Sequence, residues 1–585
     1  MNHIFRGRFG PLPLERGYRF RLYAPVAATV AIHVDGRVLA MQAAGAGWFA
    51  ADDPSAHAGS RYAFAVDGRA PVPDPASRFQ PDGVHAPSAI VDARAFAWPD
   101  DDWIGRAWHE HITYELHVGT FTVEGTYRAA VERLDALADL GVTAIELMPL
   151  AAFPGTRNWG YDGVLPYAPF AGYGSPDDLK HLIAAAHGRG LAVLLDVVYN
   201  HFGPEGNYLH GYAPTFFNAR ANTPWGPAID VTVPDVRAFF AENACYWLTE
   251  YRFDGLRLDA THEIVDGNEP SFLHELREHA ATLCGAEPGR RVALVVENDL
   301  NHLALLESGY DAQWNDDVHH AAHVLATGET ASYYRDFEFE PARLLGRALT
   351  SGYGYQGETS LHRNGVERGA PSAGYPLSAF VNFLQNHDQI GNRAFGERIS
   401  RLTSEAAVRA LSALIWLAPS PPLLFMGEEW GASTSFLFFC DFEPHLARAV
   451  TLGRRAEIGA GEAIPDPNAH ETFAASRLRW EERENEPHRA MLAFTRAALH
   501  ARAKHVIPFV SDVRGTAASV ARVGERGFTL RWRLAEGALH ADANLSDVMA
   551  DGFADRLPGE TFFHTRDPAY VRGAAPAWSV RWSRS

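Results

Sequence analysis

The amino-acid sequence predicts an α/β protein, a (β/α)8 TIM barrel that carries an N-terminal β-sandwich and a small C-terminal β-domain. Three observations predict this fold class. Short runs of alternating apolar and polar residues fill the N-terminal part, eight strongly apolar runs alternate with helical segments in the middle, and the tail returns to strand-like alternation. With 585 residues the chain is too long for one hydrophobic core. We therefore expect three domains, at residues 1–95, 105–500 and 501–585.

The first domain is predicted from short strands that are divided by turns. Tyr18–Tyr23 alternates apolar and polar residues, Val30–Val34 is more apolar, and Asp35-Gly36 and Asp67-Gly68 are turn signals. Short strands divided by turns are typical of a β-sandwich, and the Pro-rich segment Pro71–Pro75 indicates the linker that follows it. Two functions remain open for this domain: a binding module without catalytic activity, or a spacer packed against the next domain.

The barrel is predicted from eight apolar runs in series with helical segments between them. Several of these runs are apolar throughout, as expected of parallel strands that are covered on both faces. The predicted strands are Ile112–Leu116, Ala144–Met148, Ala192–Val198, Phe253–His262, Val292–Glu297, Asp311–Trp314, Ala379–Leu384 and Pro422–Met426. The predicted helices between them include Tyr127–Leu140, Ser175–Gly190 and Val236–Tyr251. Eight such units predict a closed barrel with its site at the C-terminal ends of the strands.

The connection after the third predicted strand, residues 202–233, is long and rich in Gly, Pro, Asn and aromatic residues. A long loop at that end of a barrel favours a wall of the site over a linker. Its aromatic residues Tyr208, Tyr212 and Trp225 either stack on glucose units or hold the loop together, and both interpretations stay open. A last helix near Glu486–Ala503 precedes the C-terminal β-domain, for which the sequence indicates no function.

The composition limits the classes of partner. The chain has 52 basic and 71 acidic residues and a formal net charge of −19, which argues against nucleic acid or an anionic membrane surface as the main partner. The three cysteines, Cys245, Cys284 and Cys440, lack the close spacing of a disulfide framework or a zinc site. No signal-peptide-like run and no apolar stretch long enough to span a bilayer occurs. We therefore expect a soluble, cytoplasmic protein.

The fourth predicted strand carries an arginine and an aspartate on one side. Successive side chains of a strand point to opposite faces, so Arg257 and Asp259 share one face while Leu256 and Leu258 share the other. In a barrel wall the apolar face packs on helices and the inner face can hold polar groups at one end. The guanidinium would keep Asp259 ionised, as a nucleophile at neutral pH requires. A structural salt bridge is the alternative that this strand alone leaves open.

Other predicted strands also end in polar residues. Glu297 follows the fifth strand and Asp388 the seventh, while His201 and His387 lie at the ends of the third and seventh strands. The C-terminal ends of barrel strands meet at one mouth, so we expect these groups to converge with Asp259. Crowded buried carboxylates reduce stability unless they are paired or functional, which favours a catalytic interpretation.

Two carboxylates of different character are what glycoside hydrolysis with retention of configuration requires. Glu297 follows an apolar strand, where desolvation raises a carboxyl pKa towards the value that a general acid needs. Asp259, beside Arg257, is then the nucleophile. Asp388 is predicted to hold sugar hydroxyls and distort the ring, with help from His387 and His201.

Four short motifs resemble those of the α-amylase superfamily and occur in the same order. They are Asp196–His201, Gly255–Ala260, Glu297-Asn298 and Asn386–Asp388. The resemblance implies that Asp259 is the nucleophile, Glu297 the general acid/base and Asp388 the transition-state stabiliser. It also implies a binding subsite for the attacked sugar, lined by Arg257, His201 and His387 and with Tyr161 stacked beneath the sugar.

Three loop segments resemble one branch of this superfamily, whose members hydrolyse the α-1,4 bond beside a terminal trehalose. They are Phe153–Gly163, Asn200–Tyr208 and Trp314–His320. The resemblance implies maltooligosyltrehalose, an α-1,4-glucan oligosaccharide, as substrate, with Trp314 and Asp316 among the substrate-binding residues. It further implies release of trehalose and a maltooligosyltrehalose synthase as the partner in a trehalose biosynthesis pathway.

Two alternatives remain beside this hypothesis. A glycogen branching or debranching enzyme would carry the same carboxylates and a similar N-terminal module, so only the loop segments discriminate it. A non-catalytic α-glucan-binding protein is the alternative from another class. The intact carboxylates at three strand ends argue against it, because a binding-only site gains nothing from a buried general acid.

We expect no cofactor and no required metal. His319, His320 and His323 have a spacing compatible with zinc ligands on one helix, but hydrogen bonding to substrate or helix packing is favoured for short motifs of this kind. Asn200 stands where calcium-dependent relatives of the superfamily have a ligand. No acidic cluster around it indicates an oxygen cage.

Overall fold

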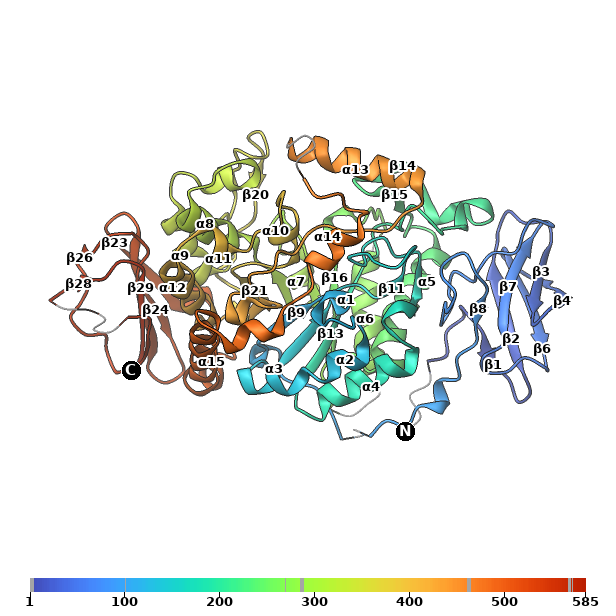
Figure 1. Cartoon of the computed structure of the whole chain (residues 1–585), viewed down its shortest axis with the longest axis horizontal. Helices are drawn as coiled ribbons and strands as arrows, with labels where there is room; N and C mark the ends of the chain where they lie inside the picture. Colours follow the sequence, from blue (N-terminus) through green and yellow to red (C-terminus); the bar gives the residue numbers. More distant parts are fainter. Residues whose placement is uncertain are drawn as a thin grey trace.

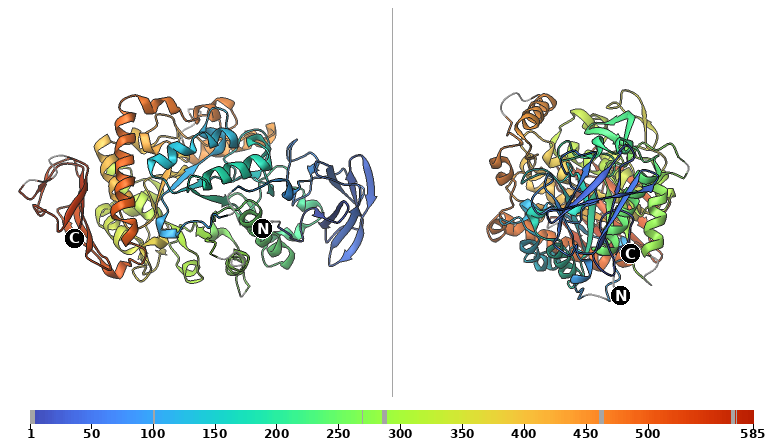
Figure 2. Two further views of the ribbon diagram at one scale, coloured as in Figure 1. Left: turned by 90° about the horizontal axis from the view of Figure 1, so that it is seen from below. Right: turned by 90° about the vertical axis from the view of Figure 1, so that its right-hand side faces the viewer.

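Three bodies follow one another along the long axis of the molecule (Figure 1). The computed structural model describes residues 5–99, 102–268, 270–284, 289–459, 464–566, 570 and 572–585. The N-terminal β-sheets lie at one end, the barrel with its helices in the middle and the C-terminal sheet at the other end, as the side view of Figure 2 also shows. The predicted fold class is confirmed.

The central body is a closed parallel barrel with the strand order β10-β13-β16-β17-β18-β21-β22-β9. Each of the eight predicted strands forms one strand of this barrel. They are β9 (Thr113–Leu116), β10 (Ala144–Leu147), β13 (Ala192–Val197), β16 (Gly255–Leu258), β17 (Ala293–Val296), β18 (Ala312–Trp314), β21 (Phe380–Phe383) and β22 (Pro422–Phe425). Every residue of these strands is buried, because helices cover the outer face and the inner face fills the barrel.

The barrel interior is filled by apolar side chains from several strands. The cluster includes Leu194, Val295, Val381, Phe383 and Leu423. Side chains of this size close the barrel floor, so polar groups are confined to the mouth and the layer just beneath it.

Close strand contacts also restrict which residues the barrel accepts. Gly255 begins β16, and a Cβ at this position would lie 2.5 Å from the carbonyl oxygen of Ala293 on the neighbouring strand. Glycine therefore lets β16 approach β17 closely at the base of the strand that carries Arg257.

Helices alternate with the strands and cover the barrel. They are α1 (Val118–Phe121), α2 (Tyr127–Val131), α3 (Leu134–Leu140), α4 (Pro176–His187), α5 (Pro234–Glu250), α6 (Phe272–Cys284), α7 (Ala304–Glu307), α8 (Asp316–Thr327), α9 (Pro341–Ser351), α10 (His387–Gly391), α11 (Ile399–Leu402), α12 (Glu405–Trp416), α13 (Pro444–Ile458), α14 (His470–Ala475) and α15 (His488–His505). The predicted start of α4 is formed by a capping box, in which Ser175 and Asp178 each bind the other's backbone N–H.

One predicted helix is divided in two. The segment predicted as a single helix, Tyr127–Leu140, forms α2 and α3 with a break at Glu132 and Arg133. Neither residue breaks helices by its own propensity. The Arg133 guanidinium instead lies 4.8 Å over the Trp480 ring, a tertiary contact that no local pattern reveals.

The N-terminal domain is a sandwich of two antiparallel four-stranded sheets, ordered β1-β2-β6-β5 and β4-β3-β7-β8. The strands are β1 (Leu12–Pro13), β2 (Tyr18–Tyr23), β3 (Val30–Val34), β4 (Arg37–Ala40), β5 (Gln42–Gly45), β6 (Trp48–Asp53), β7 (Arg61–Val66) and β8 (Ser88–Ala89). It packs directly on helix α5 of the barrel: the Phe9 ring lies 5.0 Å from the Phe239 ring, and the Trp48 Nε1–H donates to Asp235 Oδ1 at 3.1 Å.

The C-terminal domain is a five-stranded antiparallel sheet in the order β23-β24-β25-β29-β27. Its strands are β23 (Ala518–Val523), β24 (Gly527–Arg533), β25 (Ala538–Asn544), β27 (Glu560–His564) and β29 (Ser579–Arg584). Helix α15 joins it to the barrel, since Phe494 packs on Phe563 and His505 stacks on Phe562.

Short two-stranded sheets complete the fold. They are β11 (Ala151–Ala152) with β12 (Leu165–Pro169), β14 (Phe217–Thr223) with β15 (Gly226–Ile229), β19 (Glu358–Thr359) with β20 (Glu367–Arg368), and β26 (Ala550–Asp551) with β28 (Ala574–Ala575). Among the described helices, none is both long enough and apolar enough to cross a lipid bilayer.

Candidate active site

A single buried guanidinium holds three carboxylates at the mouth of the barrel. Arg257 Nη1 donates to Asp196 Oδ2 at 2.6 Å and to Asp259 Oδ1 at 2.9 Å. Its Nη2 donates to Glu297 Oε2 at 2.6 Å. The arginine side chain has no exposed surface. The carboxylates come from β13, the end of β16 and the end of β17, so the parallel register of neighbouring strands brings them together.

Asp259 is held from two sides as it leaves β16. Besides Arg257, the Asn200 Nδ2 amide donates to both its Oδ2 and its backbone oxygen at 3.0 Å each. The next residue, Ala260, has a left-handed backbone with φ of 39°, a strained conformation for a residue with a Cβ. This turn aims the Ala260 N–H at Glu297 Oε2, 2.9 Å away. The strained conformation of Ala260, directly after Asp259, therefore places a backbone N–H donor against Glu297.

Glu297 has the electrostatic surroundings that a general acid needs. Burial raises its pKa above the ordinary value, and the nearby charge of Asp259 raises it further. The Arg257 cation and the Ala260 N–H oppose this rise. The environment thus supports a carboxyl group that retains its proton at higher pH than an ordinary glutamate does.

Asp388 stands on the far side of the mouth, in the first turn of α10. Asn386 caps this helix and accepts the Asp388 N–H at 2.9 Å. The neighbouring His387 Nε2 lies 3.4 Å from Asp388 Oδ1 and 2.9 Å from the Tyr161 hydroxyl. Burial alone would lower the pKa of His387, but Asp388 and Glu115 raise it to about 10. His387 is therefore a cation at neutral pH.

Tyr161 and His201 form the adjoining wall. The Tyr161 hydroxyl donates to Asp196 Oδ2 at 2.6 Å, and its ring stacks on His387 with centroids 5.2 Å apart. His201 Nε2 lies 3.0 Å from the Tyr161 carbonyl oxygen, and burial lowers the pKa of His201 to about 4. The other ring nitrogen, Nδ1, lies against Asn200 Oδ1. The half-exposed Trp225 ring stacks on its face at 5.1 Å.

Trp314 and Asp316 follow the sixth barrel strand. The Trp314 ring is buried and lies 4.1 Å beneath the Arg257 guanidinium, so it supports that cation from below. Asp316 Oδ1 accepts a hydrogen bond from Gln389 at 3.3 Å. Burial, reinforced by the charge of Glu297, raises the pKa of Asp316 to about 8. Near neutrality Asp316 is protonated and can donate a hydrogen bond. Direct contact of Trp314 and Asp316 with substrate stays a prediction.

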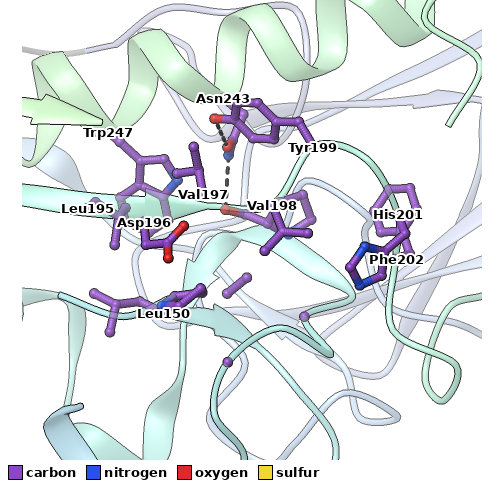
Figure 3. Close-up of a pocket in the computed structure, with 15 residues that line it drawn as sticks. Leu150, Leu195, Asp196, Val197, Val198, Tyr199, His201, Phe202, Asn243 and Trp247 are labelled. Carbon is purple, nitrogen blue, oxygen red and sulfur yellow. Dashed lines mark hydrogen bonds between the residues drawn. The ribbon is translucent and has the colours of Figure 1, made fainter. Parts of the chain in front are cut away.

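The segment that follows Asp196 is hydrogen-bonded to helix α5 (Figure 3). The Tyr199 hydroxyl donates to Asn243 Oδ1 at 2.7 Å, and Asn243 Nδ2 donates to the Pro166 carbonyl at 2.9 Å. Trp247 of the same helix fills the space beside Asp196. These contacts fix the end of β13, from which Asp196, Asn200 and His201 enter the site.

The structure brings all nine predicted site residues to one end of the barrel. Sequence reasoning left out Glu115 and Glu146, which point into the barrel just beneath them, and did not give Asp196 a place in the site. Glu115 and Glu146 lie side by side in the register of β9 and β10. Each is the only charged residue of its strand, and this signal could have identified them. Burial raises the pKa of Glu146 well above its ordinary value, and the charges of Glu115 and Asp196 raise it further.

The histidines of α8 are held in a packed cluster. His319 Nε2 lies 2.9 Å from the Tyr334 hydroxyl, and His323 Nε2 lies 2.8 Å from Glu329. The His320 ring packs on the Tyr333 ring at a tilt of 32°, with centroids 4.7 Å apart. Within the described ranges, no group of three or more His, Cys, Asp or Glu side chains is arranged to hold a metal ion. These contacts favour helix packing for the three histidines.

Comparison with known proteins agrees with this geometry. The family model "Alpha amylase, catalytic domain" matches residues 92–215, and a model of a domain of unknown function matches residues 515–582. The malto-oligosyltrehalose trehalohydrolase of Deinococcus radiodurans is 45% identical over 86% of this chain and 84% of its own length. That of Arthrobacter ramosus is 44% identical over 81% of this chain and 85% of its own. A crystal structure of a Salmonella typhimurium protein superposes with a TM-score of 0.95 at 44% identity and covers 99% of this chain and 100% of its own.

The barrel, the three carboxylates at its mouth and these matches define a glycoside hydrolase of the α-amylase superfamily. Within that superfamily the similarity extends over most of the length of the relatives. The chain belongs to the malto-oligosyltrehalose trehalohydrolase family.

Proposed function

We propose that this enzyme hydrolyses the α-1,4 bond next to the terminal trehalose of maltooligosyltrehalose and retains the anomeric configuration. One observation carries the proposal: Arg257 holds Asp259 and Glu297 together at the barrel mouth, one on each of its two terminal nitrogens. Retaining glycosidases need such a closely spaced pair of carboxyl groups. The names of the relatives support trehalose as the leaving group.

In the first step, Asp259 attacks the anomeric carbon of the glucose unit that precedes trehalose. Glu297 gives its proton to the glycosidic oxygen as the C–O bond breaks, so trehalose leaves with that proton and the glucan stays bound to Asp259. In the second step, Glu297 takes a proton from water, and the hydroxide displaces Asp259. The shortened maltooligosaccharide is released and Glu297 is again protonated.

The other polar groups fit the subsite of the attacked sugar. Asp388 and the cationic His387 face it from α10, and Asp388 can bind sugar hydroxyls more strongly as positive charge develops on the ring. Tyr161 and His201 provide the opposite wall. Arg257, fully buried on Trp314, keeps Asp259 oriented through a charge-assisted hydrogen bond.

The test is incubation of the purified enzyme with maltooligosyltrehalose and, separately, with amylose and glycogen, followed by detection of free trehalose and of new α-1,6 branches. We expect trehalose from the first substrate and little turnover of the others. Good turnover of amylose or glycogen without trehalose from the first substrate would contradict the trehalose specificity. New branches would support the branching enzyme instead.

Two further proposals concern the cellular setting. We propose a maltooligosyltrehalose synthase as pathway partner, because the terminal trehalose unit of the substrate must first be formed at the end of a glucan. We also propose a cytoplasmic location. This location is supported by the cysteines, because the chain has only three and they are not closely spaced. Cys440 is a buried free thiol.

A further inference from the structure

The first barrel strand contributes a carboxylate that accepts two hydrogen bonds from His387. Glu115 of β9 accepts a hydrogen bond from the His387 ring through Nδ1–H, and its second oxygen accepts the His387 backbone N–H at 3.1 Å. Both side chains are only 1% exposed. A buried carboxylate that binds the ring and the backbone of one residue leaves that ring a single orientation.

The direction of the adjoining hydrogen bonds fixes the protons of the ring. The Tyr161 hydroxyl donates its only proton to Asp196 at 2.6 Å, so towards His387 Nε2, 2.9 Å away, it can only accept. Nε2 must therefore carry a proton, while Nδ1 carries the proton that is donated to Glu115. A ring with two N–H groups is an imidazolium.

The charges around the ring agree with this state. Burial and the Arg257 cation lower the pKa of His387, but Asp388 and Glu115 raise it to about 10. Tyr161, Glu146 and His117 are the other titratable groups near it. Of these, burial raises the pKa of Glu146 well above its ordinary value and lowers the pKa of His117 to about 4. Glu115 and Asp388 are the two carboxyl groups that lie against the ring itself, one on each nitrogen.

We propose that Glu115 is a positioning residue that keeps His387 doubly protonated, with its Nε2–H directed at Tyr161 and Asp388 beside the sugar that Asp259 attacks. The proposal rests on the proposed function for its kinetic part alone. The positive charge of the ring strengthens the contacts that hold Tyr161 and Asp388 in place, and its loss would weaken both, since both lie against the same Nε2–H.

The matched pair of variants is Glu115→Gln and Glu146→Gln. The first removes the anionic partner of His387 and keeps the shape. The second makes the same carboxyl-to-amide change at the neighbouring position of the adjacent strand, which has no hydrogen bond to His387. The first measurement is 15N NMR of the histidine rings across pH, with His387→Gln used to assign the His387 signals, and it needs no substrate.

At pH 8 we expect protons on both His387 nitrogens in the wild type and in Glu146→Gln. In Glu115→Gln we expect the pKa of His387 to fall, so that a smaller fraction of the rings is doubly protonated at pH 8 than in the wild type. The alkaline limb of kcat/KM on maltooligosyltrehalose should then move to lower pH in this variant alone. Glu115→Gln should add little further loss in a His387→Gln background.

A neutral His387 ring in the wild type at pH 8 would overturn the proposal even if Glu115→Gln failed to fold. A His387 pKa in Glu115→Gln equal to that of the wild type, or equal shifts of the alkaline limb in both variants, would also overturn it. Absence of trehalose release by the wild type would overturn the proposed function and leave the NMR result standing.

Discussion

At the scale of single residues, the site is organised by one cation that is shared among three acids. Arg257 is fully buried and binds Asp196, Asp259 and Glu297. A buried cation is stabilised by the anions that it pairs with, and removal of a partner from such a group typically costs about 3–5 kcal/mol. The catalytic carboxylates therefore also contribute to folding. Variants of them should be isosteric.

The roles of the two carboxylates can be separated with a leaving group that needs no proton. For Glu297→Gln we expect trehalose release to fall by roughly 10²- to 10⁴-fold. With α-maltosyl fluoride the same variant should give a burst of fluoride close to one per enzyme, because fluoride leaves without an acid and the intermediate then accumulates. Asp259→Asn should give no burst, since it lacks the nucleophile.

Rapid-quench fluoride measurement checks this prediction. The control is Asp135→Asn, which changes an exposed acid on α3 that pairs with Arg189 and should leave both activities unchanged. A burst in Asp259→Asn, or steady-state rates in Glu297→Gln close to those of the wild type, would show that the roles are assigned wrongly.

His387 should make stability depend on pH. Its pKa is about 10 in the folded chain against an ordinary value of 6.5, so the folded state binds the proton more tightly than the unfolded state. This contribution is fully present below pH 6.5 and is lost as the pH rises to 10, at up to about 1.4 kcal/mol per pH unit. We expect the free energy of unfolding to fall more steeply over this window in the wild type than in His387→Gln. Parallel urea titrations would measure it, and equal slopes would contradict the assignment.

At the scale of elements, the connection between β13 and α5 lines one side of the site and also supports a site residue, His201. It forms the hairpin β14–β15, and Trp225 in the turn between the two strands stacks on His201. The same ring is 50% exposed, so one of its faces is open to a ligand. The two interpretations that the sequence left open for these aromatics are thus compatible at Trp225: the ring holds the hairpin on the site and can still contact a sugar.

Trp225→Ala should raise KM for maltooligosyltrehalose by roughly 2- to 10-fold, which corresponds to about 0.5–1.5 kcal/mol for one aromatic contact. The change in kcat should be smaller, because the carboxylates keep their own contacts. Steady-state kinetics measures both. Phe339→Ala, which removes the most exposed large apolar side chain, is the control and should change neither. An unchanged KM in Trp225→Ala would leave Trp225 a purely structural role.

At the scale of the whole molecule, the end domains are packed on the barrel through aromatic contacts. Phe9 lies against Phe239 of α5 and against Trp48, and the Arg78 side chain donates to its carbonyl at 3.0 Å. At the other end α15 carries Phe494 and His505 against the C-terminal sheet. Interfaces of this kind couple the unfolding of the neighbouring domains.

Phe9→Ala should uncouple the N-terminal sandwich from the barrel. Phe9 is only 4% exposed, and truncation of a buried Phe typically costs about 3–5 kcal/mol. In differential scanning calorimetry we expect the variant to develop a separate transition at lower temperature. Leu14→Ala, at a partly exposed position in the same segment, is the control and should keep the wild-type profile. A single unshifted transition in Phe9→Ala would mean that the two domains are held together by other contacts.

Much of the fold and of the site could be predicted from the sequence, for identifiable reasons. Parallel strands that are buried on both faces leave continuous apolar runs, and all eight were found. Polar residues at the ends of such runs stand out against them, which identified Asp259, Glu297 and Asp388. Glu115 and Glu146 carry the same signal inside their strands, but their relation to His387 depends on which strands are neighbours when the barrel closes. Arg133, at the break between α2 and α3, contacts Trp480, nearly 350 residues further along the chain.

The sequence by itself determined the barrel, its eight strands and the residues that can carry out glycoside hydrolysis, because side-chain alternation and strand-end polarity are local properties. Only the tertiary structure decided how those residues share protons and charge. Arg257 binds Asp196, Asp259 and Glu297, and Glu115 binds His387, across distances in the chain of up to 272 residues. Such pairings depend on barrel closure, and burial in the closed barrel is also what raises the pKa of Glu297.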